Sequence, residues 1–316
     1  MTTTSTPDSE DGAFRAAMAP TIEALGVLTT CIATAAGRHG NLPGPHSRAM
    51  VDLAYEETHS GDPRWQRPLS DAQTFGSMTL LAANDYAACY AQLFAGTRAP
   101  VFGHLVQVRA VLEACVVSAW LCDPKIDSTE RTRRALCELL YSAKEIGRLR
   151  IEPEGDAATR LTLWKDVADA LGWAVTWGAA NKPTVDGASR PSVPAGIDQL
   201  LLDSGDAALG RVQWSYLSAV SHVTWYGLRQ SFLGQPNEGG GLGPSIAPIG
   251  TESKAVNGQS LCLLRALRTA GEVRMTYMGW LDDEWKRARE QAVAHEVELL
   301  RRLMAARVDG PYAGVD

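Results

Sequence analysis

Long hydrophobic runs are missing from this 316-residue chain. Its most apolar stretch, residues 111–122, contains Glu113 and lies just after Arg109. Such a stretch is too short and too charged to cross a membrane as a helix. The first ten residues have neither a basic start nor an apolar run, so they do not resemble a signal peptide, and we expect residues 1–11 to form a disordered tail. Together these absences predict a cytoplasmic protein with no membrane partner.

Clusters of Lys and Arg are missing too. The formal net charge is −6 with the six His neutral, and a weakly acidic chain without a basic patch is a poor candidate for binding nucleic acid. CxxC pairs are also absent. All six cysteines fall inside expected helices, which favours buried, reduced thiols over metal ligands or redox pairs. They are Cys31, Cys89, Cys115, Cys122, Cys137 and Cys262.

The sequence contains no P-loop, no GxSxG nucleophile elbow and no dinucleotide-binding glycine motif. Patterns that resemble metal sites are weak. Glu56-x-x-His59 occurs singly at a helix end, without the second motif that a di-iron bundle needs. The acidic residues 282–284 fit a helix start better than a magnesium site, and His295-x-x-Glu298 lies on a charged helix. We therefore expect neither a metal nor an organic cofactor.

The sequence does have apolar residues at helical spacing, interrupted by clusters of Gly and Pro. This pattern predicts an all-α fold in which residues 12–316 form a single-domain multi-helix bundle. Residues 173–177 suggest a short extended piece. Two long irregular loops, residues 178–196 and 235–250, are expected to be lids, binding loops or mobile segments. The expected helices span residues 12–38, 46–59, 70–95, 99–122, 127–151, 156–172, 195–203, 207–233 and 254–306.

The last expected helix, residues 254–306, has a coiled-coil-like pattern. One face carries apolar residues and a histidine at spacings of four and three, and the opposite face is charged. This helix packs either on the body of its own chain or against a second copy, and we favour a homodimer. The residues of the pattern are Leu281, Trp285, Ala288, Ala292, His295, Leu299 and Leu303.

Polar residues inside apolar helices are informative here, because a buried polar group is costly unless it is paired. Asp85 lies in a run of Ala, Leu, Tyr and Cys without a charged neighbour. Arg109 and Glu113, in the next helix, are four residues apart and so share a face. If the two helices are antiparallel, all three side chains can form one network. Such a network is either a structural ion pair or part of a catalytic site.

The helix expected at residues 207–233 carries a polar and aromatic stripe at three- and four-residue spacing. The Ser218 hydroxyl, four residues before His222, can orient the imidazole, which can then act as a general acid or base near neutral pH. The alternative is a buried histidine satisfied by Ser218 and a carbonyl. The stripe consists of Trp214, Ser218, Ser221 or His222, Trp225 and Arg229, with Tyr216 one step off it.

Tryptophan is unusually frequent, with nine Trp against five Phe. Its large π face can hold a cation or a flat ligand, so a pocket lined partly by aromatic rings is expected. The candidate catalytic residues are His222, Asp85, Glu113 and Arg109. The candidate substrate-binding residues are Trp214, Tyr216, Ser218, Trp225, Arg229, Tyr86 and Trp120.

Short motifs mark the middle of the chain. They are Asn84-Asp85-Tyr86, Arg109-Ala-Val-Leu-Glu113-Ala, Trp120-Leu-Cys-Asp123-Pro124, Glu130-Arg131, Pro191-Ser192 and Tyr216-Leu-Ser218-Ala-Val-Ser-His222. With these motifs, residues 80–228 resemble a group of helical proteins, most of them actinobacterial, that has no agreed activity. Tyr86 stands where that group often carries His, and Val223 stands where Gly often follows the final His. The resemblance implies a shared helical scaffold and no particular reaction.

A weaker resemblance is to HEPN ribonucleases and toxins, which are small helical bundles. Their active Arg and His lie about four to six residues apart. Here the nearest Arg before His222 is Arg211, which is too far along the helix. His222 therefore has no arginine partner at the HEPN spacing within its own expected helix.

The residues favour a cofactor-independent enzyme of secondary metabolism, lyase-like or cyclase-like, that acts on a small polar metabolite. Acid–base groups would assist an intramolecular cyclisation or elimination, and Arg109 or Arg229 would stabilise a leaving group such as sulfate or phosphate. One alternative is a non-enzymatic protein for small-molecule binding, regulation or resistance, which needs aromatic walls but no acid–base pair. The second alternative is a HEPN-like ribonuclease toxin.

Overall fold

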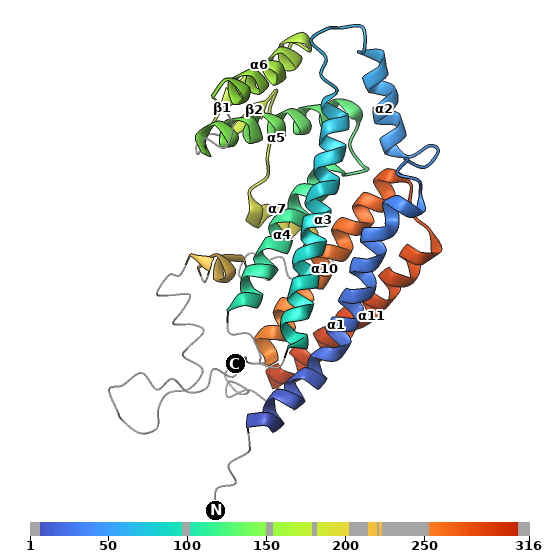
Figure 1. Cartoon of the computed structure of the whole chain (residues 1–316), viewed down its shortest axis with the longest axis vertical. Helices are drawn as coiled ribbons and strands as arrows, with labels where there is room; N and C mark the ends of the chain where they lie inside the picture. Colours follow the sequence, from blue (N-terminus) through green and yellow to red (C-terminus); the bar gives the residue numbers. More distant parts are fainter. Residues whose placement is uncertain are drawn as a thin grey trace, which may run out of the picture.

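A computed structural model describes residues 7–96, 102–149, 154–178, 182–201, 214–219, 221–222 and 253–308. The fold is all-α, as predicted, and several long helices run side by side along the long axis of the molecule (Figure 1). The first helix begins at Pro7, so the end of the expected disordered tail is helical. The helices are α1 (Pro7–Arg38), α2 (Arg48–Thr58), α3 (Pro68–Ala95), α4 (Gly103–Leu121), α5 (Ser128–Leu149), α6 (Glu154–Ala170), α7 (Val193–Leu201), α10 (Ser253–Met278) and α11 (Asp283–Val308).

Helix α4 lies inside the bundle, in contact with α3, α7 and α10. It runs antiparallel to α3, because Ser118 near its end donates a hydrogen bond of 2.8 Å to the carbonyl of Gly76 near the start of α3. A Cβ at Gly76 would lie only 2.7 Å from Cys122 Sγ, so glycine permits this close approach. The apolar faces of both helices join those of α1 and α10 in one core.

A buried ion cluster fastens α2, α5 and α10 together. The Asp52 carboxylate on α2 accepts hydrogen bonds from Arg131 Nε at 2.6 Å and from the Tyr277 hydroxyl at 3.0 Å. Ser128 donates a third bond of 2.7 Å to the same carboxylate. Asp52 and Arg131 are each 1% exposed. A buried pair of this kind is tolerated because nearly every polar atom has a partner.

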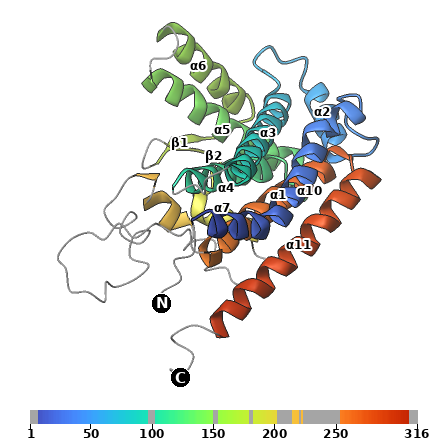
Figure 2. The ribbon, with the colours of Figure 1, turned by 60° about the horizontal axis from the view of Figure 1, so that its bottom comes forward.

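Helices α5 and α6 and a small sheet form a part of the molecule at one end of the bundle (Figures 1 and 2). The strands β1 (Val175–Trp177), β2 (Pro183–Val185) and β3 (Ala188–Ser189) pair antiparallel in the order β1-β2-β3. Asp186 and Gly187 both have positive φ and form the tight turn between β2 and β3. The extended piece expected at residues 173–177 is confirmed as β1. The prediction of an irregular loop over residues 178–196 is wrong, because β2, β3 and the start of α7 lie within it.

The prediction of one continuous helix over residues 254–306 is also wrong. Helix α10 ends at Met278 because Gly279 adopts a φ of +70°. The Trp280 N–H then donates back to the Met275 carbonyl at 2.8 Å, which is a typical glycine helix end. Helix α11 begins anew because the Asp282 carboxylate accepts a hydrogen bond of 2.7 Å from the Trp285 N–H. The acidic residues at 282–284 are therefore a helix start, as expected.

The coiled-coil-like pattern of α11 packs on its own chain. Trp285, Ala288, Ala292 and Leu299 are buried, and α11 contacts α1 and α10. The Leu281 side chain lies before α11 and is exposed. This face of α11 is therefore already covered within one chain, and the homodimer remains a prediction.

Two helices are long and apolar enough to cross a membrane by length and composition. They cover residues 14–38 of α1 and 103–121 of α4, with mean hydropathies of 1.5 and 1.3. Within the bundle, 56% of the most apolar 18-residue stretch of α4 is buried, and 44% of the corresponding stretch of α1. Core helices of soluble proteins pass the same test, so this evidence is weak. The expected cytoplasmic location stays a prediction.

Other residues singled out in the sequence have structural roles. The Glu56 carboxylate accepts hydrogen bonds from the N–H groups of Leu69 and Ser70 at the start of α3, at 2.7 and 3.0 Å. His59 stacks on Trp65 with ring centroids 4.5 Å apart. None of the six cysteines forms a disulfide, and all but Cys89 are buried.

Candidate functional site

Arg109 and Glu113 form the ion pair expected on α4. Arg109 Nε lies 2.8 Å from Glu113 Oε1, across one turn of the helix. The two side chains are 20% and 37% exposed, so the pair lies at the edge of the core rather than inside it. The ion pair holds the guanidinium on the surface of α4 that faces Trp214 and His222.

The described residues 214–219 and 221 are helical and His222 follows them; we call these residues the short piece. Leu217 is fully buried in the main core, and Trp214 and Tyr216 pack partly against it. The His222 N–H donates to the Ser218 carbonyl at 3.0 Å, which continues the helical turn. Leu217 thus anchors the piece to the bundle while His222 stays exposed.

The structure brings Arg109 to His222 across two separate elements. Arg109 Nη1 lies 3.4 Å from His222 Nε2, and its guanidinium carbon lies 5.9 Å from the centre of the Trp214 ring. We name Arg109, Glu113, Trp214 and His222 the Arg–His site. The short piece and the first half of α4 lie side by side in both views (Figures 1 and 2).

The contacts define the chemistry that the Arg–His site can perform. Because a guanidinium can only donate, His222 Nε2 acts as the acceptor, and the neutral imidazole carries its proton on Nδ1. If a substrate takes over the Arg109 donor, Nε2 of the exposed imidazole becomes free to accept a proton from that substrate. The Trp214 indole N–H is buried and has no acceptor among the described residues. Arg109, which is partly exposed, is the donor that could hold an oxyanion.

Asp85 does not join this site. It is exposed on α3, and within the described chain it forms no ion pair. The buried residue of that turn is its neighbour Asn84, which is 5% exposed. The expected network of Asp85 with Arg109 and Glu113 is therefore wrong, because the core-facing surface of α3 passes through residues 80, 83, 84 and 87 instead.

Two expected substrate-binding residues also lie elsewhere. Tyr86 is 43% exposed on α3. Trp120 packs against α5, where the Arg134 guanidinium lies 5.7 Å from the centre of its ring. At the usual rise of an α-helix, Trp120 is about 16 Å further along α4 than Arg109. Trp225 and Arg229 fall outside the described residues, as does the loop expected at residues 235–250.

Ser218 is half-buried, and the described contact between it and His222 runs through its carbonyl rather than its hydroxyl. Tyr216 packs against the core beside Leu217. Of the eleven candidate residues, the structure thus gathers Arg109, Glu113, Trp214 and His222, with Ser218 and Tyr216 on the same short piece. The catalytic and substrate-binding roles expected of these residues stay predictions.

Sequence reasoning missed a buried polar group near the start of α4. His104 is 2% exposed and lies beside Gln259 on α10. Burial lowers the pKa of His104 to about 4, and the Gln259 contact opposes this shift. Beside it, the hydroxyls of Tyr90 and Ser260 lie 2.7 Å apart. The signal was present, because His104 precedes Val108, Val111 and Cys115 at helical spacing on the core face of α4.

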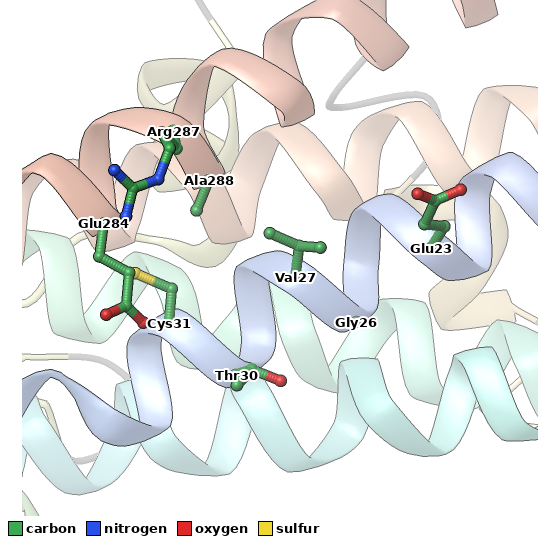
Figure 3. Close-up of a pocket in the computed structure, with 8 residues that line it drawn as sticks. All are labelled: Glu23, Gly26, Val27, Thr30, Cys31, Glu284, Arg287 and Ala288. Carbon is green, nitrogen blue, oxygen red and sulfur yellow. The ribbon is translucent and has the colours of Figure 1, made fainter.

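An open groove between α1 and α11 lies apart from the Arg–His site. Val27 and Cys31 on α1 and Arg287 and Ala288 on α11 are among the residues that line it (Figure 3). Across the described ranges, no three His, Cys, Asp or Glu side chains gather as metal ligands would. Comparison with known protein families, curated proteins and solved structures found no match to this chain.

Proposed function

We propose that the Arg–His site is the active site of an enzyme that performs acid–base chemistry on a small polar metabolite. The observation that supports this most strongly is the 3.4 Å contact between Arg109 Nη1 and His222 Nε2. These two residues come from elements 113 positions apart in the chain, yet they meet at a place that solvent can reach.

Each residue has a distinct role in the proposal. Once a substrate has taken over the Arg109 donor, His222 removes the substrate's proton through its freed Nε2 and later releases that proton to solvent. Arg109 stabilises negative charge that develops on a leaving group, and Glu113 holds the guanidinium in place through its 2.8 Å bond. Trp214 supplies a flat apolar wall beside the guanidinium.

The reaction class that fits these roles is an elimination or intramolecular cyclisation, as in secondary metabolism. A base takes an N–H or C–H proton while a sulfate or phosphate group departs toward Arg109. The roles need neither a metal nor an organic cofactor, and we expect none.

The proposal is tested by comparing the wild-type chain with His222→Asn and Arg109→Lys on a metabolite extract of the source organism. Mass spectrometry before and after incubation identifies any compound that is consumed. We expect the wild type to consume one compound at least about a hundredfold faster than His222→Asn does. His46→Asn is the matched control, because His46 is exposed with positive φ, a conformation that Asn tolerates.

A compound that binds the protein and returns unchanged would instead favour the alternative of a binding or resistance protein. Equal consumption by the wild type and His222→Asn would contradict the role of His222.

A second candidate, metal-independent RNA cleavage, is favoured by one observation. HEPN-like ribonucleases use an Arg and a His together, and here Arg109 supplies in space the arginine that is missing near His222 in the sequence. The negative net charge argues against an RNA substrate. Incubation of a labelled RNA with the wild type and with His222→Asn separates the two candidates, because the small-molecule enzyme leaves the RNA intact.

A further inference from the structure

Between residues 16 and 37, the outer face of α1 is exposed and almost uncharged. Seven exposed residues follow one another at spacings of three and four, which aligns them on one side of the helix. Only Glu23 among them carries a charge. We name this row the α1 seam; it consists of Ala16, Ala19, Glu23, Gly26, Thr30, Ala33 and Gly37.

The glycines of the α1 seam have no use within a single chain. A Cβ placed on Gly26 or Gly37 would meet no atom within 4 Å, and neither residue has a positive φ. Glycine inside a helix lowers its stability relative to alanine. By contrast, a Cβ at Gly271 on α10 would lie 2.5 Å from the Trp285 ring, so that glycine is explained by internal packing. The two seam glycines are explained if the backbone of another helix approaches them.

The charges beside the seam form a simple pattern. Glu23 lies toward one end of the groove between α1 and α11, and Arg287 lies toward the other end (Figure 3). Neither side chain forms an ion pair with any residue that the structure describes. Glu284, also at the Arg287 end, is already bound to Arg38 at 3.0 Å. One unpaired acid and one unpaired base are therefore left at opposite ends of the same groove.

We propose that the α1 seam and this groove bind a second copy of the chain, with the two α1 helices antiparallel. A two-fold axis near Gly26 and Val27 would set Glu23 of each copy opposite Thr30 and Arg287 of the other. The unpaired acid and base would thus meet twice in one symmetric contact. A different partner would need its own matching charges, whereas the second copy already carries them.

The expected complex is a weak dimer. A face about one helix wide buries less area than a permanent interface, although small residues let the helix axes approach closely. This interface differs from the dimer expected through the core-facing side of residues 254–306, and it is independent of the proposed enzyme activity.

Sedimentation velocity of the whole chain, from about 1 to 200 µM, tests the proposal. We expect the wild type to shift from monomer toward dimer over this range. The leucine side chain of Gly26→Leu fits open space within one chain, so the variant should keep the helical circular dichroism signal. It should raise the dissociation constant of the dimer at least about tenfold. Gly61→Leu is the matched control, because Gly61 is also exposed with open space and lies outside α1.

Charge reversal tests the orientation of the two copies. Glu23→Arg and Arg287→Glu should each sediment as monomers, because each sets like charges together twice. An equimolar mixture of the two variants should form a dimer again, since both contacts then join opposite charges. Glu290→Arg is the control, because Glu290 is exposed on α11 but does not line the groove.

A wild type that stays monomeric at every concentration would overturn the proposal. If such a monomer also co-sedimented with phosphatidylcholine–phosphatidylglycerol vesicles, the apolar face of α1 would be a membrane contact instead. A dimer that survives Gly26→Leu and both charge reversals would equally overturn it.

Discussion

The buried residue His104 shows how the core tolerates a polar side chain. His104 is neutral near pH 7 because burial lowers its pKa to about 4. Charging it would place an imidazolium between the Tyr90 and Phe94 rings, whose centroids lie 6.5 and 5.5 Å from its own. The residue therefore links the pH of the solution to the packing of α3 against α4.

We expect the folded state to lose stability at acid pH partly through His104. Since its pKa is lowered by folding, the unfolded chain binds more protons as pH falls below about 6.5, and stability is lost down to about pH 4. The largest loss from this residue is about 3 kcal/mol. Urea unfolding of His104→Gln and the wild type at several pH values measures it. A wild type and variant with parallel pH profiles would contradict this role.

Two helical glycines should respond in opposite directions to alanine. Gly26→Ala should raise the free energy of unfolding of the monomer by about 1 kcal/mol, because its Cβ meets open space. Gly271→Ala should lower it, because its Cβ would lie 2.5 Å from the Trp285 ring. Urea unfolding at low protein concentration measures both. A loss of stability in Gly26→Ala would show that the α1 seam is packed within one chain.

At the scale of elements, the ion cluster of Asp52 stabilises the packing of α2, α5 and α10 against one another. Its carboxylate has partners on two helices besides its own, and it is shielded from water. Removing one charge leaves the Arg131 guanidinium buried without compensation.

We expect Asp52→Ala to lower the free energy of unfolding by about 3–5 kcal/mol. Thermal or urea unfolding measures the change. Asp62→Ala is the control, because Asp62 pairs with Arg64 at the surface and its loss should have little effect. Similar small effects for both variants would contradict the importance of the cluster.

The sequence predicted the helices well where Gly and Pro separate them, as between α2 and α3 or α3 and α4. It missed the end of α10 at Gly279, because Leu281, Trp285 and Ala288 keep a helical spacing near the break. It missed β2 and β3 because strands of three and two residues are too short to show alternation. The Asp-Gly turn at residues 186–187 was the available signal for that hairpin.

The candidate site was predictable only in part, for a physical reason. The pairing of Arg109 with Glu113 follows from their spacing within one helix. Asp85 was misplaced because α3 is rich in Ala on all sides, so its pattern does not show which side faces the core. The contact of Arg109 with His222 joins residues from distant parts of the chain, and such tertiary contacts leave no mark on local spacing.

At the scale of the whole molecule, the fold keeps three parts of the chain apart. The Arg–His site lies beside α4, the α1 seam lies on the outside of the bundle, and the α5–α6 part with its sheet lies at one end (Figure 1). Variants of the seam should therefore change association without changing turnover per chain. Turnover that falls in step with the loss of the dimer would instead place part of the active site on the second copy.

The most direct test of the proposed function is a double-variant cycle on whichever compound the extract assay identifies. The values of kcat/KM are measured for wild type, Arg109→Lys, His222→Asn and the double variant. If Arg109 and His222 act as one unit, the double variant should be no slower than the slower single variant. Losses that multiply independently would contradict the shared site, and wild-type rates in either single variant would contradict the proposal altogether.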